Sequence, residues 1–219
     1  MSAAPRVYTA AEYLEFERAS EGKHEFVNGH IYPMRGGSDT DRASGMSGGT
    51  DAHALIGWNV LAAFHAAFRG RACRAHTSDM RMKILDTGMY TYPDVSALCG
   101  RPELEDGRRD TLLNPSLVIE VLSPSTEDYD RGDKFAHYRR LASLREYVLV
   151  AQDRPHVERY VRAGDGWVLT EFDRLDDVVA LPSVDATLVL RDVYERVEFT
   201  ERPRPRMVRE VAASGYAAV

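Results

Sequence analysis

The chain has 219 residues, of which 44% are apolar and 28% are charged, a composition that is ordinary for a soluble globular protein. Its formal net charge of −6 excludes any argument for nucleic-acid binding from overall charge, so such a role has to rest on local basic patches. The sequence has no apolar run of the roughly 18 residues that a membrane span needs, and no apolar signal segment at its N-terminus. We therefore expect a cytoplasmic protein without a membrane partner.

The length predicts one domain, over residues 1–195. Residues 196–219 carry arginines and prolines but no core-forming pattern, so we expect a basic, flexible tail there. The two cysteines, Cys73 and Cys99, lack the close spacing of a metal site. We expect both to be reduced and to serve as small buried apolar residues, as is usual in a reducing compartment.

The first elements have clear local signals. Thr9 and Glu12 form a capping-box pattern, which predicts a helix that ends near residues 20–22. Asn28-Gly29 lies between two β-prone segments and predicts a hairpin over residues 25–32, with Glu25 at its start. Residues 33–52 are rich in glycine and predict a long loop, but they lack the phosphate-binding pattern G-x-x-x-x-G-K-[ST].

A helix is predicted from His53 to Phe68, because apolar residues recur at helical spacing on one face. Two histidines on this helix are candidate site residues. We expect His65 to be a packed histidine, whereas for His53, which adjoins the loop, a site role and a structural role are equally supported.

Two β-rich runs follow the helix, over residues 74–84 and 90–98, and each predicts one strand. Pro93 cannot donate a ladder hydrogen bond, so it belongs at a strand start, an edge or a bulge. Asp94 is therefore a carboxylate at a strand irregularity. Residues 101–114 are polar and predict a loop.

The run Leu117-Val118-Ile119-Glu120-Val121-Leu122, closed by Ser123-Pro124, predicts a strand buried on both faces. An unpaired charge inside such a strand costs several kcal/mol or more. Taken alone, Glu120 could point off the strand end into water or be satisfied by a core arginine. A functional role requires that other site residues lie beside it.

The remainder of the chain predicts a helix over about residues 131–141, capped by the segment 130–133, with Lys134 at the border of its apolar stripe. A buried strand at 148–150 and a hairpin formed by residues 157–162 and 167–172 come next, and residues 187–190 predict a last short strand. By position alone, an ordinary solvated lysine is the favoured interpretation of Lys134.

Asp94 and Glu120 fall on consecutive predicted strands, and neighbouring strands lie about 4.8 Å apart. Two acids at matching heights could share one cation, and Mg²⁺ needs only one or two carboxylates because it keeps several waters. Such a metal can activate water and stabilise charge on a phosphodiester oxygen. A lysine nearby could stabilise the developing charge, or orient or deprotonate the attacking water.

Pro93-Asp94 followed by Glu120 on the next strand resembles the PD-(D/E)XK nuclease signature. Over about residues 8–190 the chain also resembles the Uma-two family of restriction-endonuclease-like proteins, most specifically in the stretch 118–126. This resemblance implies an α/β fold with a restriction-endonuclease-like core, a mixed β-sheet flanked by helices, to which the chain adds a C-terminal β-hairpin. It also implies a divalent metal, Mg²⁺ or Mn²⁺, held by Asp94 and Glu120.

One position departs from the general signature, because Leu122 stands where the lysine two residues after the acid is expected. The family pattern places its lysine on the following helix, which matches Lys134. By the same resemblance Glu25 completes the acidic site. The implied catalytic residues are Asp94, Glu120, Lys134 and Glu25.

The leading hypothesis is an endonuclease that hydrolyses DNA with magnesium and acts as a homodimer, since cutting both strands of a duplex usually needs two active sites. The alternative is a catalytically silent nucleic-acid-binding or regulatory protein of the same fold. A two-carboxylate glycosidase is a distant third, because no aromatic cluster accompanies the acids. Candidate phosphate contacts are Arg74, Lys83, Arg108, Arg109, Arg139 and Arg140.

Overall fold

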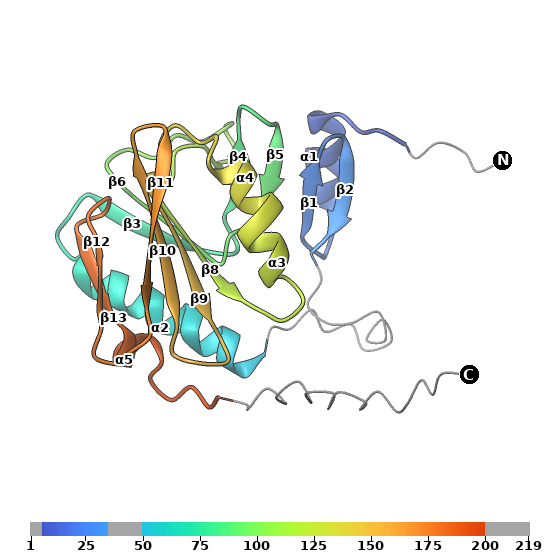
Figure 1. Cartoon of the computed structure of the whole chain (residues 1–219). Helices are drawn as coiled ribbons and strands as arrows, with labels where there is room; N and C mark the ends of the chain where they lie inside the picture. Colours follow the sequence, from blue (N-terminus) through green and yellow to red (C-terminus); the bar gives the residue numbers. More distant parts are fainter. Residues whose placement is uncertain (1–5, 35–49, 200–219) are drawn as a thin grey trace, which may run out of the picture.

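A computed structural model describes residues 6–34 and 50–199 of the chain (Figure 1). The predicted basic tail from residue 200 onward, and residues 35–49 of the predicted glycine-rich loop, lie outside the described residues. Two mixed sheets and a small hairpin account for the strands, and helices cover the larger sheet, so the predicted α/β class with a mixed sheet flanked by helices is confirmed.

The larger sheet has six strands in the order β11-β10-β9-β8-β6-β3. Its centre is the parallel pair β8 and β9, and the other neighbours are antiparallel. Every residue of β8 and of β9 is buried, as expected for strands covered on both faces. The strands are β3 (Cys73–Thr77), β6 (Val95–Cys99), β8 (Leu117–Leu122), β9 (Glu146–Ala151), β10 (Val157–Ala163) and β11 (Gly166–Phe172).

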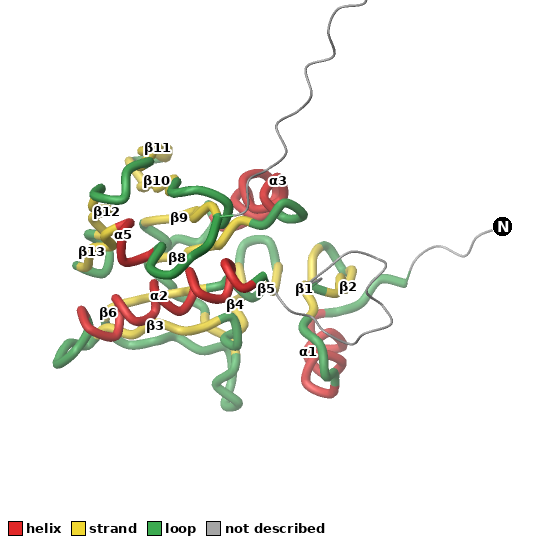
Figure 2. Tube along the Cα trace, turned by 90° about the horizontal axis from the view of Figure 1, so that it is seen from below, coloured by secondary structure: helices red, strands yellow, loops and turns green. Residues whose placement is uncertain are grey.

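The smaller sheet has five strands in the order β2-β1-β5-β4-β7, and only the pair β4 and β7 is parallel. Helix α1 (Ala10–Ala19) packs on its β1–β2 end (Figure 2). Tyr13, Phe26 and Tyr90 form a small core there. The strands are β1 (His24–Val27), β2 (His30–Pro33), β4 (Arg81–Ile84), β5 (Met89–Thr91) and β7 (Thr111–Leu112).

Alternation along β8 divides the main core into two layers. Leu117, Ile119 and Val121 face helix α2 and a small hairpin. Helix α2 spans Asp51–Ala67. The hairpin consists of β12 (Val178–Leu181) and β13 (Ala186–Val189), and the short helix α5 (Leu190–Val193) follows it. Val118 and Leu122 face the helical segment 127–138 on the other side. Glu120 points to the same face of β8 as Val118 and Leu122, so its carboxyl group lies in the layer between β8 and that helical segment.

The local signals at the N-terminus are confirmed. The Thr9 hydroxyl accepts from the Glu12 N–H while the Glu12 carboxylate accepts from the Thr9 N–H, which is a complete capping box. Asn28 and Gly29 both have positive φ, of 50° and 82°, as the two-residue hairpin turn requires. Helix α2 begins two residues earlier than predicted, after Thr50 as N-cap.

The two β-rich runs each form two strands rather than one. The run 74–84 turns at residues 78–80, and the run 90–98 breaks at residues 92–94 around Pro93. In both cases one half joins the large sheet and the other half joins the small sheet. The prediction of single strands was therefore wrong, although Pro93 does mark the break. Asp94 lies where the chain enters the large sheet.

The helix predicted over about 131–141 begins and ends earlier, and it is not regular. It comprises α3 (Glu127–Tyr129), a π-helical turn η2 (Asp130–Lys134) and α4 (Phe135–Tyr138). Asp130 is thus inside the helical segment rather than at its cap, and it is only 3% exposed. Single π-helical turns of this kind occur frequently at functional sites.

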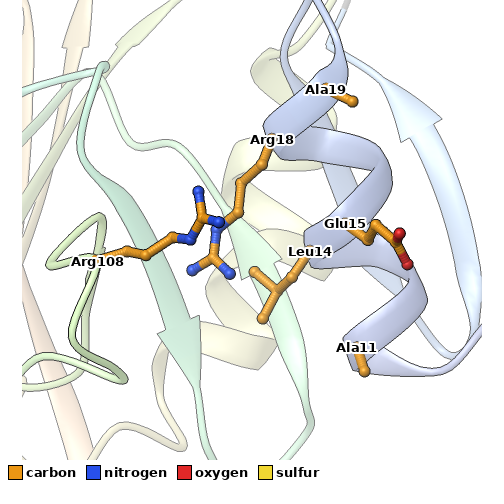
Figure 3. Close-up of a pocket in the computed structure, with 6 residues that line it drawn as sticks. All are labelled: Ala11, Leu14, Glu15, Arg18, Ala19 and Arg108. Atoms are coloured by element: carbon orange, nitrogen blue, oxygen red, sulfur yellow. The ribbon is translucent and has the colours of Figure 1, made fainter.

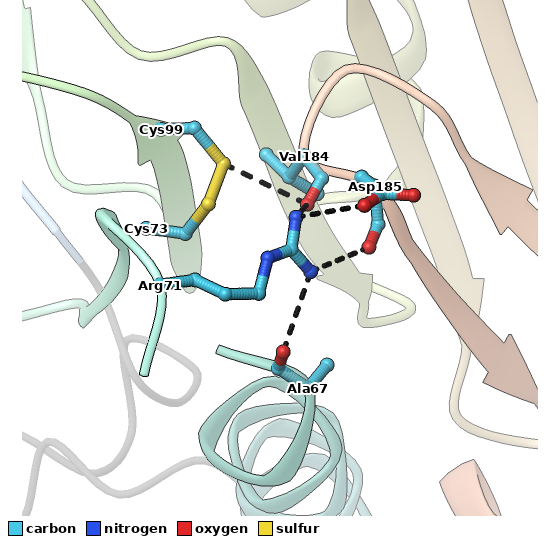
Figure 4. Close-up of a disulfide and its surroundings, with 6 residues drawn as sticks. All are labelled: Ala67, Arg71, Cys73, Cys99, Val184 and Asp185. Atoms are coloured by element: carbon cyan, nitrogen blue, oxygen red, sulfur yellow. Dashed lines mark hydrogen bonds and ion pairs between the residues drawn. A yellow bond between two sulfur atoms is a disulfide. The ribbon is translucent and has the colours of Figure 1, made fainter. Parts of the chain in front are cut away.

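The expectation of two reduced, buried cysteines was wrong. The antiparallel register of β3 and β6 places Cys73 opposite Cys99, and the two form a disulfide with a Cα–Cα distance of 3.9 Å. Cys99 is exposed and Cys73 is half-buried. Beside them, Arg71 donates to the carbonyl groups of Ala67, Val184 and Asp185, tying the end of α2 to the β12–β13 turn (Figure 4).

The predicted C-terminal hairpin is present as β10 and β11, and it adds two strands to the edge of the large sheet. The strand predicted at 187–190 is β13, and it pairs with β12 in a second hairpin that the sequence did not reveal. Over residues 6–34 and 50–199, no helix combines the length and apolarity that crossing a membrane demands.

A charge network attaches α1 to the rest of the chain. The Arg18 guanidinium donates to Asp110 at 2.9 Å and to Asp106 at 2.7 Å, and buried Arg81 contacts Asp110 at 3.0 Å. Beside this network, α1 and the 101–110 loop border a cavity of about 410 Å³, into which Arg18 and Arg108 extend (Figure 3). The hydrogen bond from Arg18 is the main cause that lowers the pKa of Asp110 to about 2.

Replacing Asp110 by Asn should lower the free energy of unfolding by about 1–2 kcal/mol at pH 7, because Arg18 and Arg81 lose a charged acceptor. The native pKa lies below the ordinary value of 3.8, so this contribution is complete above that value and declines as the pH falls toward 2. Urea unfolding at pH 7 and pH 2.5 measures it.

As a control, Asp176→Asn removes an exposed partner of Arg191 and should change stability little. An Asp110→Asn difference of equal size at both pH values would contradict the assignment of the stabilisation to the ionised carboxylate.

Candidate functional site

The candidate site is built on the pair β6 and β8. Val95 lies opposite Ile119, so the next pair toward the strand end is Asp94 with Glu120. The backbone N–H of Asp94 donates to Glu120 Oε2 at 3.2 Å, and the N–H of Val121 donates to Asp94 Oδ2 at 2.7 Å. The strand break at Pro93 frees these backbone groups from the ladder, so the two acids lie side by side as predicted.

Glu120 is 3% exposed, and its two oxygens differ in their surroundings. Oε1 accepts from the Tyr138 hydroxyl at 2.7 Å and lies 2.9 Å from Lys134 Nζ, whereas Oε2 faces the Asp94 backbone. Burial raises the pKa of Glu120, and the positive charge of Lys134 opposes that rise only in part. Holding this carboxyl group ionised therefore calls for further positive charge.

Lys134 brings its ammonium group into the centre of the site. Its Nζ lies 3.4 Å from Asp130 Oδ1 and 3.8 Å from Glu25 Oε1, in addition to Glu120. The residue is 5% exposed. Burial alone would lower the pKa of Lys134, but the carboxyl groups of Glu120, Asp130 and Glu25 raise it well above its ordinary value. Lys134 is thus held as a cation.

Glu25 reaches the site from β1 and is 8% exposed. Its carboxyl group accepts hydrogen bonds from the Thr91 and Tyr129 hydroxyls, the latter at 2.9 Å. These contacts join the β1–β2 hairpin, β5 and α3 at one point. Glu25 meets Lys134 but no contact joins it to Asp94 or Glu120 within the described residues, so its link to the acid pair runs through the lysine.

His53 forms the more open side of the site. Its Nε2 lies 3.2 Å from Asp94 Oδ2, and the two side chains are 26% and 22% exposed. Burial acts against protonation of His53, but the hydrogen bond and charge of Asp94 raise its pKa above the ordinary value. Burial would raise the pKa of Asp94, yet His53 and the Val121 N–H lower it. His65, three turns along α2, is exposed rather than packed.

Charge balance is the main electrostatic feature. Three carboxyl groups, from Glu120, Asp130 and Glu25, contact the ammonium group of Lys134. A fourth, from Asp94, lies beside Glu120 and is paired with His53 at the edge of the site. An excess of buried carboxyl groups is favourable only if a cation or protons compensate it. The contacts of the Asp94 carboxylate with described residues all use Oδ2, so within the described part of the chain Oδ1 is available as an oxygen ligand.

This donor set fits a hard divalent cation that keeps several waters. It does not fit an all-protein metal cage, because the described residues contain no cluster of three or more His, Cys, Asp or Glu side chains that could enclose a metal ion. Asp94 and Glu120 are the residues that would hold the cation. Further ligands would have to come from water or from a phosphate oxygen.

The basic residues predicted to contact phosphate come from several separate elements. Lys83 Nζ forms an ion pair with Glu105 Oε1 at 2.5 Å, and the Arg139 guanidinium lies over the ring of Phe135. Arg74 lies on the edge strand β3, and Arg108 borders the cavity beside α1. These residues do not form one basic patch around the acid pair.

Asp130 and Tyr138 are site residues that the sequence did not reveal. Asp130 precedes Lys134 by four residues, a spacing at which two helical side chains meet, and Tyr138 follows Lys134 at the same spacing. The sequence pattern of Asp130, Lys134 and Tyr138, each four residues apart, could therefore have identified Asp130 and Tyr138 as neighbours of the lysine. Asp130 was instead assigned to a helix cap, because the start of the helix was placed too late.

Replacing His53 by Ala should weaken divalent-metal binding by about 10–100-fold, because the imidazole orients the Asp94 carboxylate as a ligand. Titration calorimetry with Mn²⁺ measures the affinity directly. His65→Ala on the same helix is the matched control and should leave the affinity unchanged. Equal affinities for wild type and His53→Ala would contradict the orienting role.

Comparison with known proteins places this arrangement in context. The model of the Uma2 family, described as "Putative restriction endonuclease", matches residues 10–193. Two uncharacterized proteins of Synechocystis sp. are similar in sequence. One, sll1609, is 35% identical over 170 residues, which is 77% of this chain and 89% of the relative, and the other, slr1290, is 33% identical over 191 residues, or 86% and 92%.

Among solved structures, the chain is similar to a putative nuclease belonging to DUF820 from Anabaena variabilis, with a TM-score of 0.67. The alignment covers 89% of this chain and all of that one, at 18% sequence identity. At this identity the likeness establishes the shared fold. The family match includes every residue of the candidate site described above, from Glu25 to Tyr138.

Proposed function

Because the chain belongs to the Uma2 family of restriction-endonuclease-like proteins, we propose that it is a metal-dependent endonuclease that hydrolyses phosphodiester bonds in DNA. One observation carries the proposal: the carboxyl groups of Glu120, Asp130 and Glu25 converge on one lysine, and Asp94 adds a fourth acid beside Glu120 at the point where β6 and β8 meet. Neither a purely structural ion pair nor a two-carboxylate glycosidase needs this excess of acids around a single cation.

Asp94 and Glu120 are proposed to hold Mg²⁺, with Mn²⁺ as a substitute. A divalent cation bound there supplies a Lewis acid that lowers the pKa of water and neutralises charge on the phosphodiester. The protein's part is to fix the two carboxyl groups, Asp94 through the Val121 N–H and His53, and Glu120 through Tyr138 and Lys134. These contacts limit the rotation of both side chains before substrate arrives.

Lys134 is proposed to act as a fixed positive charge beside the phosphate and not as a base. A lysine that is to remove a proton near neutral pH needs a lowered pKa, whereas the surrounding acids raise the pKa of Lys134. An ammonium group at this place favours the transition state, in which the phosphoryl oxygens gain negative charge. Glu25 is a positioning residue, since its Oε1 lies 3.8 Å from Lys134 Nζ and gives the lysine a further carboxyl partner besides Glu120.

A catalytically silent nucleic-acid-binding protein is the second candidate. It is favoured by Leu122, which replaces the usual lysine of the nuclease signature, and by Glu120 Oε1, which Tyr138 and Lys134 already occupy. For the nuclease function we propose a homodimer, because each chain carries one site and cutting a duplex requires two. Size-exclusion chromatography with light scattering tests the oligomeric state.

Asp94→Asn and Glu120→Gln should each reduce nicking of plasmid DNA in Mg²⁺ or Mn²⁺ by about 10³-fold or more, and EDTA should abolish it. Glu146→Gln is the matched control, because Glu146 is also a strand glutamate, is 1% exposed and lies opposite Leu117 at the far end of β8. Nicking by both site variants at the wild-type rate would refute the metal site. DNA binding without any nicking by the wild type would support the silent alternative.

Lys134→Met should reduce the cleavage rate by about 10²–10³-fold while leaving Mn²⁺ affinity equal or higher, because the acids lose a competing positive charge. Lys83→Met removes another paired lysine, outside the site, and serves as control. Stopped-flow cleavage and calorimetry separate the two effects. A parallel loss of metal affinity and rate would show that Lys134 is needed for the structure of the site instead.

A further inference from the structure

A cavity of about 580 Å³ lies directly beside the candidate site. One wall is the β1–β2 hairpin and the other is the helical segment 127–138. Glu25 belongs to both the cavity and the site, since its Oε1 lies 3.8 Å from Lys134 Nζ. The volume is within the range of about 300–1,000 Å³ that is common for small-molecule sites.

Strand alternation sets the chemistry of the hairpin wall. Phe26 and Ile31 point into the small core under α1, so Glu25, Val27 and Tyr32 lie on the opposite face, toward the cavity. Glu25 and Tyr32 are direct cross-strand partners. Tyr32 is 51% exposed, so its ring is available to a ligand.

The helical wall adds a second aromatic and polar groups. Tyr129 is held by its hydroxyl contact with Glu25, and His137 has a buried Nδ1 without a hydrogen-bond partner among the described residues. The charged side chains that line the cavity, Glu25 and Asp133, are both acids. They disfavour a phosphate group and suit a neutral ligand with N–H donors.

We propose that this cavity binds one unstacked nucleobase of the DNA strand whose phosphate occupies the acid site. The inference rests on the proposed nuclease function and adds a substrate class to it, namely DNA with an unpaired nucleotide at the cleavage point. Tyr32 supplies a stacking surface, which is tolerant of base identity. Asn28, Asp133 and His137 supply hydrogen-bonding groups for the edge of the base.

The preference of the cavity for an unpaired base can be measured from DNA binding alone, without cleavage. In the Asp94→Asn variant, fluorescence anisotropy compares three labelled duplexes that differ at one position: fully paired, with one unpaired nucleotide, and with an abasic site in place of that nucleotide. The unpaired nucleotide should bind about tenfold more tightly than the abasic site, in line with one base stacked on an aromatic ring.

Tyr32→Ala, made in the same background, should remove this difference, and Tyr32→Phe should keep it. Trp58→Ala is the matched control, because Trp58 is an exposed aromatic on α2 outside the cavity. Equal affinity for the base and the abasic site, or a difference that survives Tyr32→Ala, would overturn the proposal.

The wild-type protein then separates this proposal from the nuclease function. Cleavage of the paired duplex at the same rate as the duplex with an unpaired nucleotide would overturn the base cavity and leave the nuclease standing. Selective, Tyr32-dependent binding of the unpaired nucleotide with no cleavage of any duplex would support the cavity and refute catalysis.

Discussion

The contact of Lys134 with Glu120 is the interaction on which the candidate site depends. Both groups are almost fully buried, and a buried ion pair is stable only when further hydrogen bonds satisfy its remaining donors and acceptors. Asp130 and Glu25 form further ion pairs with Lys134, while the Tyr138 hydroxyl and the Asp94 N–H donate hydrogen bonds to Glu120. Glu25 comes from the small sheet, Asp94 directly precedes a strand of the large sheet, and Asp130 and Tyr138 belong to the helical segment 127–138, so the pair also joins the two sheets to that segment.

Much of this arrangement could be predicted from residue order. The capping box, the Asn-Gly turn and the buried strand around Glu120 are local signals, and each produced the element it predicts. Asp94 and Glu120 could be placed together because they fall on consecutive predicted strands. In the structure the corresponding strands β6 and β8 are neighbours in the sheet, although β7 lies between them in the chain. Lys134 was assigned to the site only through the resemblance to a family, since its position in the sequence alone also fits a solvated lysine.

The errors concern contacts between distant segments. A strand that leaves one sheet and enters another has the same residue pattern as one continuous strand, so the breaks at residues 78–80 and 92–94 could not be located from periodicity. The disulfide depends on the register of β3 against β6, which two isolated cysteines do not specify. The π-helical turn, which spans Asp130 to Lys134, is equally absent from the residue pattern.

The departure at Leu122 has a structural explanation in this arrangement. Leu122 points to the same face of β8 as Glu120, and it packs in the apolar layer beneath the helical segment with Phe135, Tyr138 and Leu141. A lysine at this position would put a charge into that apolar layer, which is costly unless the charge is paired. From the helix, Lys134 approaches the same carboxyl group across the layer instead, and Asp130, one helical turn earlier, compensates its charge. Moving the lysine from strand to helix therefore preserves a cation beside Glu120 while leaving the strand entirely apolar on either side of the acid.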